Sequence, residues 1–440
     1  MTPTPNRFRN ARVMAAICTA GLAVSVALSG CGNDEGGGGT KAETGSDMPA
    51  DTSGPARESV KAGTGCGENK DQHCPIELMP GDHNREEIAQ ALMDTPAREG
   101  SIDDLINEDR ANPTEWAGPT EPVSLPGEAL SIVGISCNSA LSGCVAPLEA
   151  IGELSDELGY DFTLYDGQGN GETISKYMLS SITSGVDAIF VAGVDPLTIQ
   201  QGLEEADKAS IPVISITSAL STPNPVVEAP PDAFWPLFDL SSNFVMAGRA
   251  MADWAIWDSK GEGTIIVLDG KEGTSQVSSA AVVDEINKQC PKCKTLSYTV
   301  LGAEVGTTFP QKTLAFLRNH PDAKYIILPY DPAAAALVPV LQQAGQTDVR
   351  LISVIGMAEN LQFIRDGQSQ TADVAWDCGY EGWAAMDQLF RYLAGQEFSE
   401  PIGENTPQIL LDSTNVGTGS GNWTSDIDYR AEYRQLWGLA

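Results

Sequence analysis

The chain contains few basic residues for its length. Lys and Arg number 26 against 60 Asp and Glu in 440 residues, and the formal net charge is -34 at pH 7. A nucleic-acid partner requires a basic face for the phosphate backbone, and attachment to an anionic membrane by charge requires clustered Lys and Arg. The composition therefore excludes nucleic acid as a partner and membrane docking driven by charge.

Sequence signatures of common enzymes are also missing. There is no Gly-x-Ser-x-Gly elbow and no P-loop, and only three histidines, none of them in a cluster that could supply a general base. The run Gly167-Gln-Gly-Asn-Gly171 lacks the spacing of a dinucleotide fingerprint. We therefore expect a protein that is not an enzyme, with no catalytic residue, cofactor or metal.

The N-terminus has the pattern of a bacterial lipoprotein signal. Arg7, Arg9 and Arg12 precede the apolar run 13–28, and Leu28-Ser29-Gly30-Cys31 ends it. A plain secretory signal or a transmembrane anchor would be the alternatives, but the run is short for a span. We predict a signal peptide at 1–30, a lipid on Cys31, and attachment to the extracytoplasmic face of the cell membrane.

Two further segments precede the regular part of the chain. Residues 31–63 are rich in Gly, Ser, Thr, Asp and Glu, and this composition predicts a disordered tether. Residues 64–127 show no alternation of strands and helices and are Pro-rich toward their end. We interpret them as an N-terminal extension packed on, or leading into, the core.

The nine cysteines favour an oxidising compartment. Cys18 lies in the signal peptide, Cys31 would carry lipid, and Cys378 is left over. Local disulfides are the simplest interpretation of the remaining six, which lie in close pairs: Cys66 with Cys74, Cys137 with Cys144, and Cys290 with Cys293. A redox or zinc role for Cys290-Pro-Lys-Cys293 is the alternative, and zinc would need two more ligands.

From about residue 129 the chain alternates strands with helices. The expected strands are 130–136, 162–165, 188–191 and 211–215, then 264–268, 296–300, 325–328, 351–355 and 372–376. Such alternation predicts an α/β fold with two doubly wound parallel-sheet lobes in succession. Ligands of such sheets bind outside the carboxyl ends of the strands.

Several segments, in this order and spacing, resemble type I periplasmic binding proteins of the ribose-binding-like branch. The resemblance covers about 130–412. The segments that carry it are Tyr165-Asp-Gly-Gln-Gly169, Gly185-Val-Asp-Ala-Ile189, Gly193-Val-Asp-Pro196, Ala209-Ser-Ile-Pro-Val213, 361–367, Gly382-Trp-Ala-Ala-Met-Asp387 and Arg391-Tyr-Leu-Ala-Gly395.

The resemblance implies two lobes that exchange chain and close on a ligand about a hinge. Lobe one would comprise 128–238 and 376–407, and lobe two 239–375 and 408–440. The implied function is the substrate-binding lipoprotein of a sugar ABC importer, a monomer whose partners are a small-molecule ligand and the importer permease. A sensory receptor that reports its ligand to a membrane kinase or chemoreceptor is the alternative, because both roles need hinge closure.

Positions carried over from the family give the candidate ligand-binding residues. They are Ser136, Asn138, Ser139, Ser142, Thr217, Ser218, Gln276, Tyr330, Asp331, Met357, Trp376 and Asp377. Several replace a charged or amide residue of the family's sugar binders: Thr217-Ser218 stands where Asp-Arg or Asp-Asn is usual, Ala280 near an expected arginine, Met357-Ala358 for Phe-Asp, and Trp376 for Gln.

These replacements remove partners that desolvated sugar hydroxyls need. A more apolar, non-sugar ligand is therefore an alternative. Simpler roles also exist: Trp376 could pack the hinge, and Asp331, Asp166 and Asp195 could cap helices. Phe234 and Trp235 could cover either the cleft or the edge of a lobe.

Overall fold

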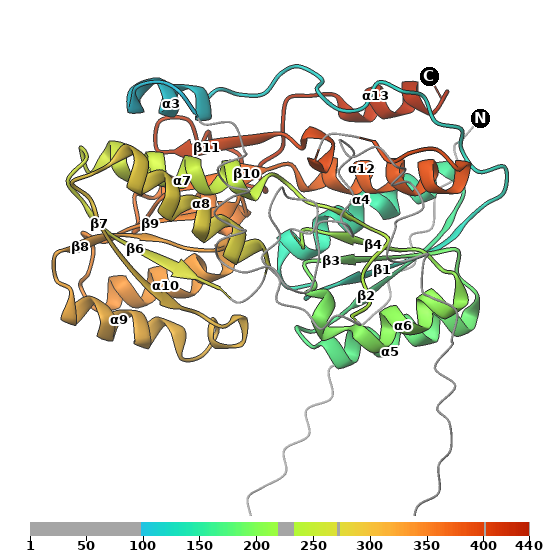
Figure 1. Ribbon diagram of the computed structural model, residues 1–440, viewed down its shortest axis with the longest axis horizontal. Helices are drawn as coiled ribbons and strands as arrows, with labels where there is room; N and C mark the ends of the chain where they lie inside the picture. The colour runs from blue at the N-terminus through green and yellow to red at the C-terminus, as the bar shows by residue number, and fades with distance from the viewer. Residues whose placement is uncertain (1–97, 219–232, 271–272, 400–401, 440) are drawn as a thin grey trace, which may run out of the picture. The chain divides into compact units, whose positions relative to one another are not determined.

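The computed structural model describes residues 98–218, 233–270, 273–399 and 402–439, which form two sheets (Figure 1). The first is entirely parallel, in the order β2-β1-β3-β4-β5: β1 Ser131–Ser136, β2 Asp161–Asp166, β3 Ala188–Ala192, β4 Val213–Ile216 and β5 Phe238–Leu240. The second has the order β11-β10-β9-β8-β6-β7: β6 Thr264–Asp269, β7 Lys294–Thr299, β8 Ala323–Ile327, β9 Arg350–Ile355, β10 Gln370–Trp376 and β11 Gln408–Asp412. Only β11, paired with β10, runs antiparallel in it.

Helices cover both faces of each sheet, as the alternation predicts. The first lobe contains α4 Ser142–Leu158, α5 Gly171–Ser184, the 3-10 turn η1 Pro196–Thr198 and α6 Gln200–Ala209. The second contains α7 Phe244–Asp258, α8 Gly273–Gln289, η2 Gly302–Glu304, α9 Phe309–Asn319, α10 Asp331–Gln343 and α11 Ala358–Arg365. Central strands such as β3 are buried along their whole length because helices pack on both sides.

The end of the chain returns to lobe one. Helix α12 (Cys378–Ala394) packs on α4, the short turn η3 (Ile402–Asn405) follows it, and β11 then joins the second sheet. Helix α13 (Tyr429–Leu436) belongs with lobe one again, because Tyr433 and Trp437 share a core with Trp383 and the Trp383 and Trp437 rings stack at 5.4 Å. Residues 408–440 are thus divided between the lobes, whereas the sequence analysis assigns all of them to lobe two.

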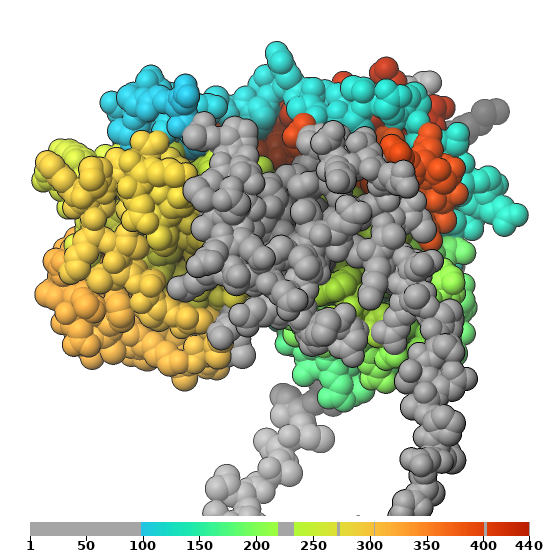
Figure 2. Space-filling view, in the orientation of Figure 1, coloured from blue at the N-terminus to red at the C-terminus, as the bar shows by residue number. Residues whose placement is uncertain are grey.

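The described part of the N-terminal extension contacts both lobes. Helix α3 (Ile102–Asp109) packs on α7, and Ile106 is buried in the core of lobe two. Further along, the Trp116 ring meets the Tyr433 ring edge-on at 5.0 Å, and the Val123 N–H donates to the Leu436 carbonyl. In the space-filling view this segment (blue and cyan) forms a band that borders atoms of both lobes (Figure 2).

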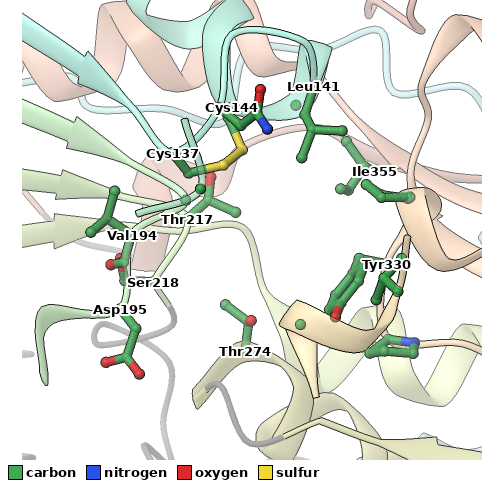
Figure 3. Close-up of a pocket in the computed structure, with 18 of the residues that line it drawn as sticks. Cys137, Leu141, Cys144, Val194, Asp195, Thr217, Ser218, Thr274, Tyr330 and Ile355 are labelled. Atoms are coloured by element: carbon green, nitrogen blue, oxygen red, sulfur yellow. A yellow bond between two sulfur atoms is a disulfide. The ribbon is translucent and has the colours of Figure 1, made fainter. Parts of the chain in front are cut away.

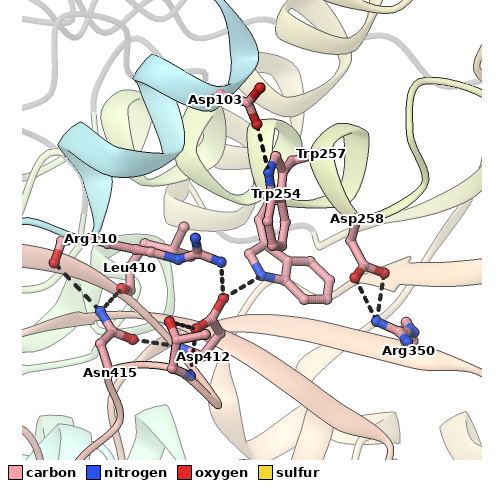
Figure 4. A network of polar contacts seen from close by, with 10 residues as sticks. Asp103, Arg110, Trp254, Trp257, Asp258, Arg350, Leu410, Asp412 and Asn415 are labelled. Atoms are coloured by element: carbon pink, nitrogen blue, oxygen red, sulfur yellow. Dashed lines mark hydrogen bonds and ion pairs between the residues drawn. The ribbon is translucent and has the colours of Figure 1, made fainter.

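An ion pair fixes the extension to lobe two (Figure 4). The Arg110 guanidinium bonds to Asp412 at the end of β11, and the Trp254 indole N–H donates to the same carboxylate at 3.2 Å. Arg110 also lies over the Trp257 ring, 4.4 Å from its centroid. Both partners of the ion pair are largely shielded from water, so the attraction between their charges is screened less than in an exposed pair.

Several sequence predictions concern residues outside the described ranges. They are the signal peptide, the lipid on Cys31, the tether 31–63 and the Cys66 and Cys74 pair. Among the described residues, none of the helices is long and apolar enough to span a bilayer.

A buried carboxyl group joins α12 to the loop after β4 and to the crossing between the lobes that follows β5. Glu381 accepts hydrogen bonds from the Ser242 N–H at 3.2 Å, the Ser242 hydroxyl at 2.9 Å and the Thr217 hydroxyl at 3.3 Å. Burial raises the pKa of Glu381 to about 8. Glu381 therefore holds a proton in the folded protein at pH values where the unfolded chain has released it.

The close approach of α12 to α4 gives a first prediction. A Cβ on Gly382 would lie 2.2 Å from the Pro147 carbonyl oxygen, which is backbone and cannot move aside. Ala normally stabilises a helix interior by about 1 kcal/mol relative to Gly. Gly382→Ala should instead lower the free energy of unfolding in urea by about 1–3 kcal/mol through overpacking. Gly419→Ala, at a position with open space, is the matched control. Equal or greater stability of Gly382→Ala would contradict this packing.

The Glu381 contact gives a second prediction. Burial raises the pKa of Glu381 above the ordinary glutamate value of 4.5, so its contribution to stability is complete below pH 4.5 and is lost as the pH rises toward 8. The melting temperature should therefore fall between pH 5 and pH 8, and less steeply in Glu381→Gln. Glu149→Gln, on the exposed side of α4, should keep the wild-type slope. Identical slopes in wild type and Glu381→Gln would refute the assignment.

Candidate functional site

A pocket of about 790 Å³ lies between the carboxyl ends of the two sets of parallel strands. Lobe one contributes the loops after β1, β2, β3 and β4, and lobe two contributes the start of α8, the η2 segment, and the turns after β8 and β9. Phe244 and Trp376, at the crossings, complete the wall, and their rings meet edge-on at 5.3 Å. The pocket therefore occupies the edge where α/β sheets bind ligands.

A disulfide forms part of the wall in lobe one (Figure 3). Cys137 and Cys144 are bonded, with Cα atoms 5.7 Å apart, and both line the pocket. The bond packs on Gly193 in the loop after β3, where a Cβ would lie 2.9 Å from the Cys144 Sγ. The loop that carries Asn138 and Leu141 is thus held at both ends. The second bonded pair, Cys290 with Cys293, is not among the pocket-lining residues, and Cys378 is a buried free thiol.

Half of the residues predicted from the sequence line the pocket. They are Asn138, Thr217, Ser218, Tyr330, Met357 and Trp376. The aromatic and apolar members dominate its surface, together with Leu141 and Ile355, which face each other from the two lobes (Figure 3).

The other predicted residues are not among the lining residues of the pocket. The hydroxyls of Ser136 and Ser139 share a hydrogen bond of 2.8 Å, and the Ser139 N–H donates to Asp166. Gln276 is half-buried on α8 and is not among the lining residues. The Ser142 hydroxyl donates to Asn422. Asp377 caps α12 and accepts from Ser425. These residues were expected in the pocket, but the three serines and Asp377 have hydrogen-bond partners within the fold.

Asp331 is the clearest of these corrections. It is fully buried and accepts hydrogen bonds from the N–H groups of Gly356 at 3.0 Å and Met357 at 2.7 Å, and from the Ser353 hydroxyl at 2.5 Å. Burial raises the pKa of Asp331 to about 6, and burial together with the nearby Asp331 charge raises the pKa of Asp373 further. Asp331 thus fixes the turn that presents Met357 to the pocket.

That turn is conformationally strained. Ile355 has φ of 128°, which a β-branched residue rarely adopts, and Gly356 follows with φ of 86°. The hydrogen bonds to Asp331 offset this cost. Sequence reasoning misses Ile355 as a lining residue, since a strand residue of this type signals core packing.

The pocket is poor in charge. Its polar side chains among the described residues are Asn138, Asn170, Asp195, Thr198, Thr217, Ser218, Thr274 and Tyr330. None of the described lining residues is Lys or Arg. Asp195 caps η1 through the Leu197 N–H, and burial raises its pKa. Asp195 therefore both caps a helix, as predicted, and lines the pocket. Of the two aromatic residues near the crossing, Trp235 lines the pocket and Phe234 packs in the core of lobe one.

The described residues contain no group of three or more His, Cys, Asp and Glu side chains placed to hold a metal ion. The arrangement of the pocket suits binding of a neutral molecule that has both hydroxyl groups and an apolar face.

Comparison with known proteins places this chain among binding proteins. A family model described as periplasmic binding protein domain matches residues 141–397. The ribose import binding protein RbsB of Escherichia coli K12 is 24% identical over 244 residues, which cover 54% of this chain and 77% of that protein. The xylitol-binding protein of Mycolicibacterium smegmatis is 23% identical over 194 residues, which cover 43% of this chain and 51% of that protein.

Solved structures share the fold. An ABC transporter solute binding protein from Mycobacterium smegmatis with bound glycerol gives a TM-score of 0.57 at 19% identity and covers 68% of this chain and 100% of that one. The Caulobacter myo-inositol binding protein gives a TM-score of 0.55 at 19% identity, over 66% and 96%. The predicted two-lobed α/β fold is confirmed. Because the matched model spans more than half of the sequence, the chain belongs to the periplasmic binding protein family of non-catalytic binding proteins, and the prediction that it is not an enzyme is confirmed.

Proposed function

We propose that this chain is the extracytoplasmic solute-binding lipoprotein of an ABC importer and captures a neutral sugar or polyol between its lobes. The observation that carries the proposal is the pocket at the facing strand ends, with hydroxyl and amide groups beside an apolar wall. Named relatives bind ribose and xylitol, and similar structures hold glycerol and myo-inositol.

The chemistry of the wall narrows the ligand class. Trp376, Met357, Leu141 and Ile355 provide apolar surface for the C–H face of a ring or chain, and Thr274, Thr217 and Asn138 provide hydrogen bonds. A carboxylate or phosphate would have no Lys or Arg partner among the described lining residues. We therefore favour neutral ligands with few hydroxyls per carbon, such as deoxy sugars, over anions.

A binding screen tests this proposal. The full chain, purified in detergent, is titrated by thermal shift and calorimetry with ribose, xylitol, myo-inositol, a 6-deoxyhexose, and an anionic control such as gluconate. We expect a neutral polyol or sugar to raise the melting temperature, because a ligand that binds only the folded state stabilises it. Thr274→Val should weaken that ligand about three- to tenfold, as expected for one hydrogen bond.

Thr299→Val, which removes an exposed hydroxyl in the same lobe, should leave the affinity unchanged. Stabilisation by gluconate alone would contradict the neutral-ligand proposal. Hits confined to aromatic or aliphatic compounds without hydroxyls would move the function to the apolar alternative.

The proposed anchor has a separate test. Cys31→Ser removes the acceptor of the lipid while leaving the rest of the signal in place. We expect wild type to fractionate with membranes and the variant to lose that association, because acyl chains supply the membrane affinity. Membrane association of the variant at the wild-type level would rule out lipidation at Cys31. Cys378→Ser, a buried cysteine in the body of the protein, is the matched control.

A further inference from the structure

The segment 413–428, here called the C-terminal connector, passes from one lobe to the other. It begins after β11 in the sheet of lobe two and ends at α13, which packs with lobe one. The family match ends at residue 397, so the connector lies beyond the matched region.

One side chain of the connector contacts both lobes through a single atom. The Asn422 Oδ1 accepts a hydrogen bond of 3.1 Å from the Ser142 hydroxyl and one of 3.0 Å from the Ala358 N–H. Ser142 is the first residue of α4 in lobe one, and Ala358 is the first residue of α11 in lobe two. The two bonds coexist only when these helix ends are close together.

The neighbours of Asn422 strengthen the bridge. The Trp423 N–H donates to the Gly356 carbonyl at 2.9 Å, on the strained turn of lobe two. The Ser425 N–H and hydroxyl donate to Asp377, the cap of α12 in lobe one, at 2.9 and 3.0 Å. Directly after Asn422, the connector is thus bonded to lobe two through Trp423 and to lobe one through Ser425.

The lobes also meet directly at this place. A Cβ on Gly143 would lie 3.0 Å from the Ile355 Cγ2, so the start of α4 leaves little space to the strained turn. Leu141 and Ile355, both pocket-lining, face each other beside it (Figure 3). Separation of the lobes at this edge would break this contact and one of the two Asn422 bonds.

We propose that Asn422 is a positioning residue that links the lobes at the edge of the pocket and shifts the ligand-free protein toward the closed arrangement. An effect of Asn422 on ligand affinity would rest on the proposed function, the capture of a ligand between the lobes. The lobe arrangement itself is tested without ligand, so its outcome is independent of whether the proposed ligand class is correct.

The experiment measures the distance between the lobes by double electron–electron resonance. Spin labels are placed on Lys176→Cys in α5 and Ala315→Cys in α9, two exposed positions on helices that Figure 1 shows on the side away from α3 and α13. The full chain in detergent is compared with its Asn422→Ala and Asn415→Ala variants, all without ligand. A preparation lacking the introduced cysteines corrects for labelling of native thiols.

We expect Asn422→Ala to reduce the ratio of closed to open distances about fivefold, since the closed form holds one more hydrogen bond than the open form. Asn415→Ala should leave the distances unchanged. Asn415 is the same residue type in the same connector, but its bonds to the Asp412 N–H, the Leu410 carbonyl and the Arg110 carbonyl do not bridge the pocket edge.

Unchanged distances in Asn422→Ala, or the same shift in both variants, would overturn the proposal. Ser142→Ala provides a milder second variant, because it removes only the bond to lobe one and should shift the distances in the same direction. Hydrogen exchange at the Ala358 amide gives an independent readout: it should accelerate in Asn422→Ala and not in Asn415→Ala. Equal exchange in the two variants would also contradict the assignment.

Discussion

A parallel sheet has all of its strand-to-helix turns at one edge, and the pocket exists because two such edges face each other. This constraint determines where every other feature of the site must lie. The chain crosses between the sheets after β5, after β10 and before β11, next to that edge, and Glu381 of α12 binds the first of these crossings through Ser242. Most wall residues lie in short turns, and the strands that precede these turns, buried on both faces, fix the positions of the turns.

Several polar residues near the pocket stabilise the turns that form its wall and do not line it. Asp331 illustrates the division: the residue next to it, Tyr330, lines the pocket, while its own carboxylate binds the backbone of the following turn. The strain at Ile355 and Gly356 is sustained by this carboxylate and by Trp423 of the connector. The wall of the pocket is therefore preorganised. The groups left to contact a ligand are the hydroxyl, amide and apolar side chains that line it.

The two segments outside the matched family region have a common property. The extension contacts lobe two through α3 and Arg110 and lobe one through Trp116 and Val123. The connector makes the return passage, and Asn112 of the extension bonds to Asp426 of the connector. Each added link between lobes restricts their relative motion, so these segments bear on the hinge even though most of their residues are remote from the pocket.

The sequence by itself determined the alternation of strands and helices, the parallel lobes, the binding class and six of the pocket-lining residues, because burial on two faces and turns after strands leave local signals. It did not reveal the short strands β5 and β11 or the division of 408–440 between lobes, since three to five residues carry little periodicity. Only the tertiary structure decided whether a polar residue after a strand faces the pocket, as Asn138 and Thr217 do, or the interior, as Asp331 and Asp377 do. The direction of each side chain depends on which N–H and hydroxyl groups from distant segments need an acceptor, and the local sequence contains no information about those segments.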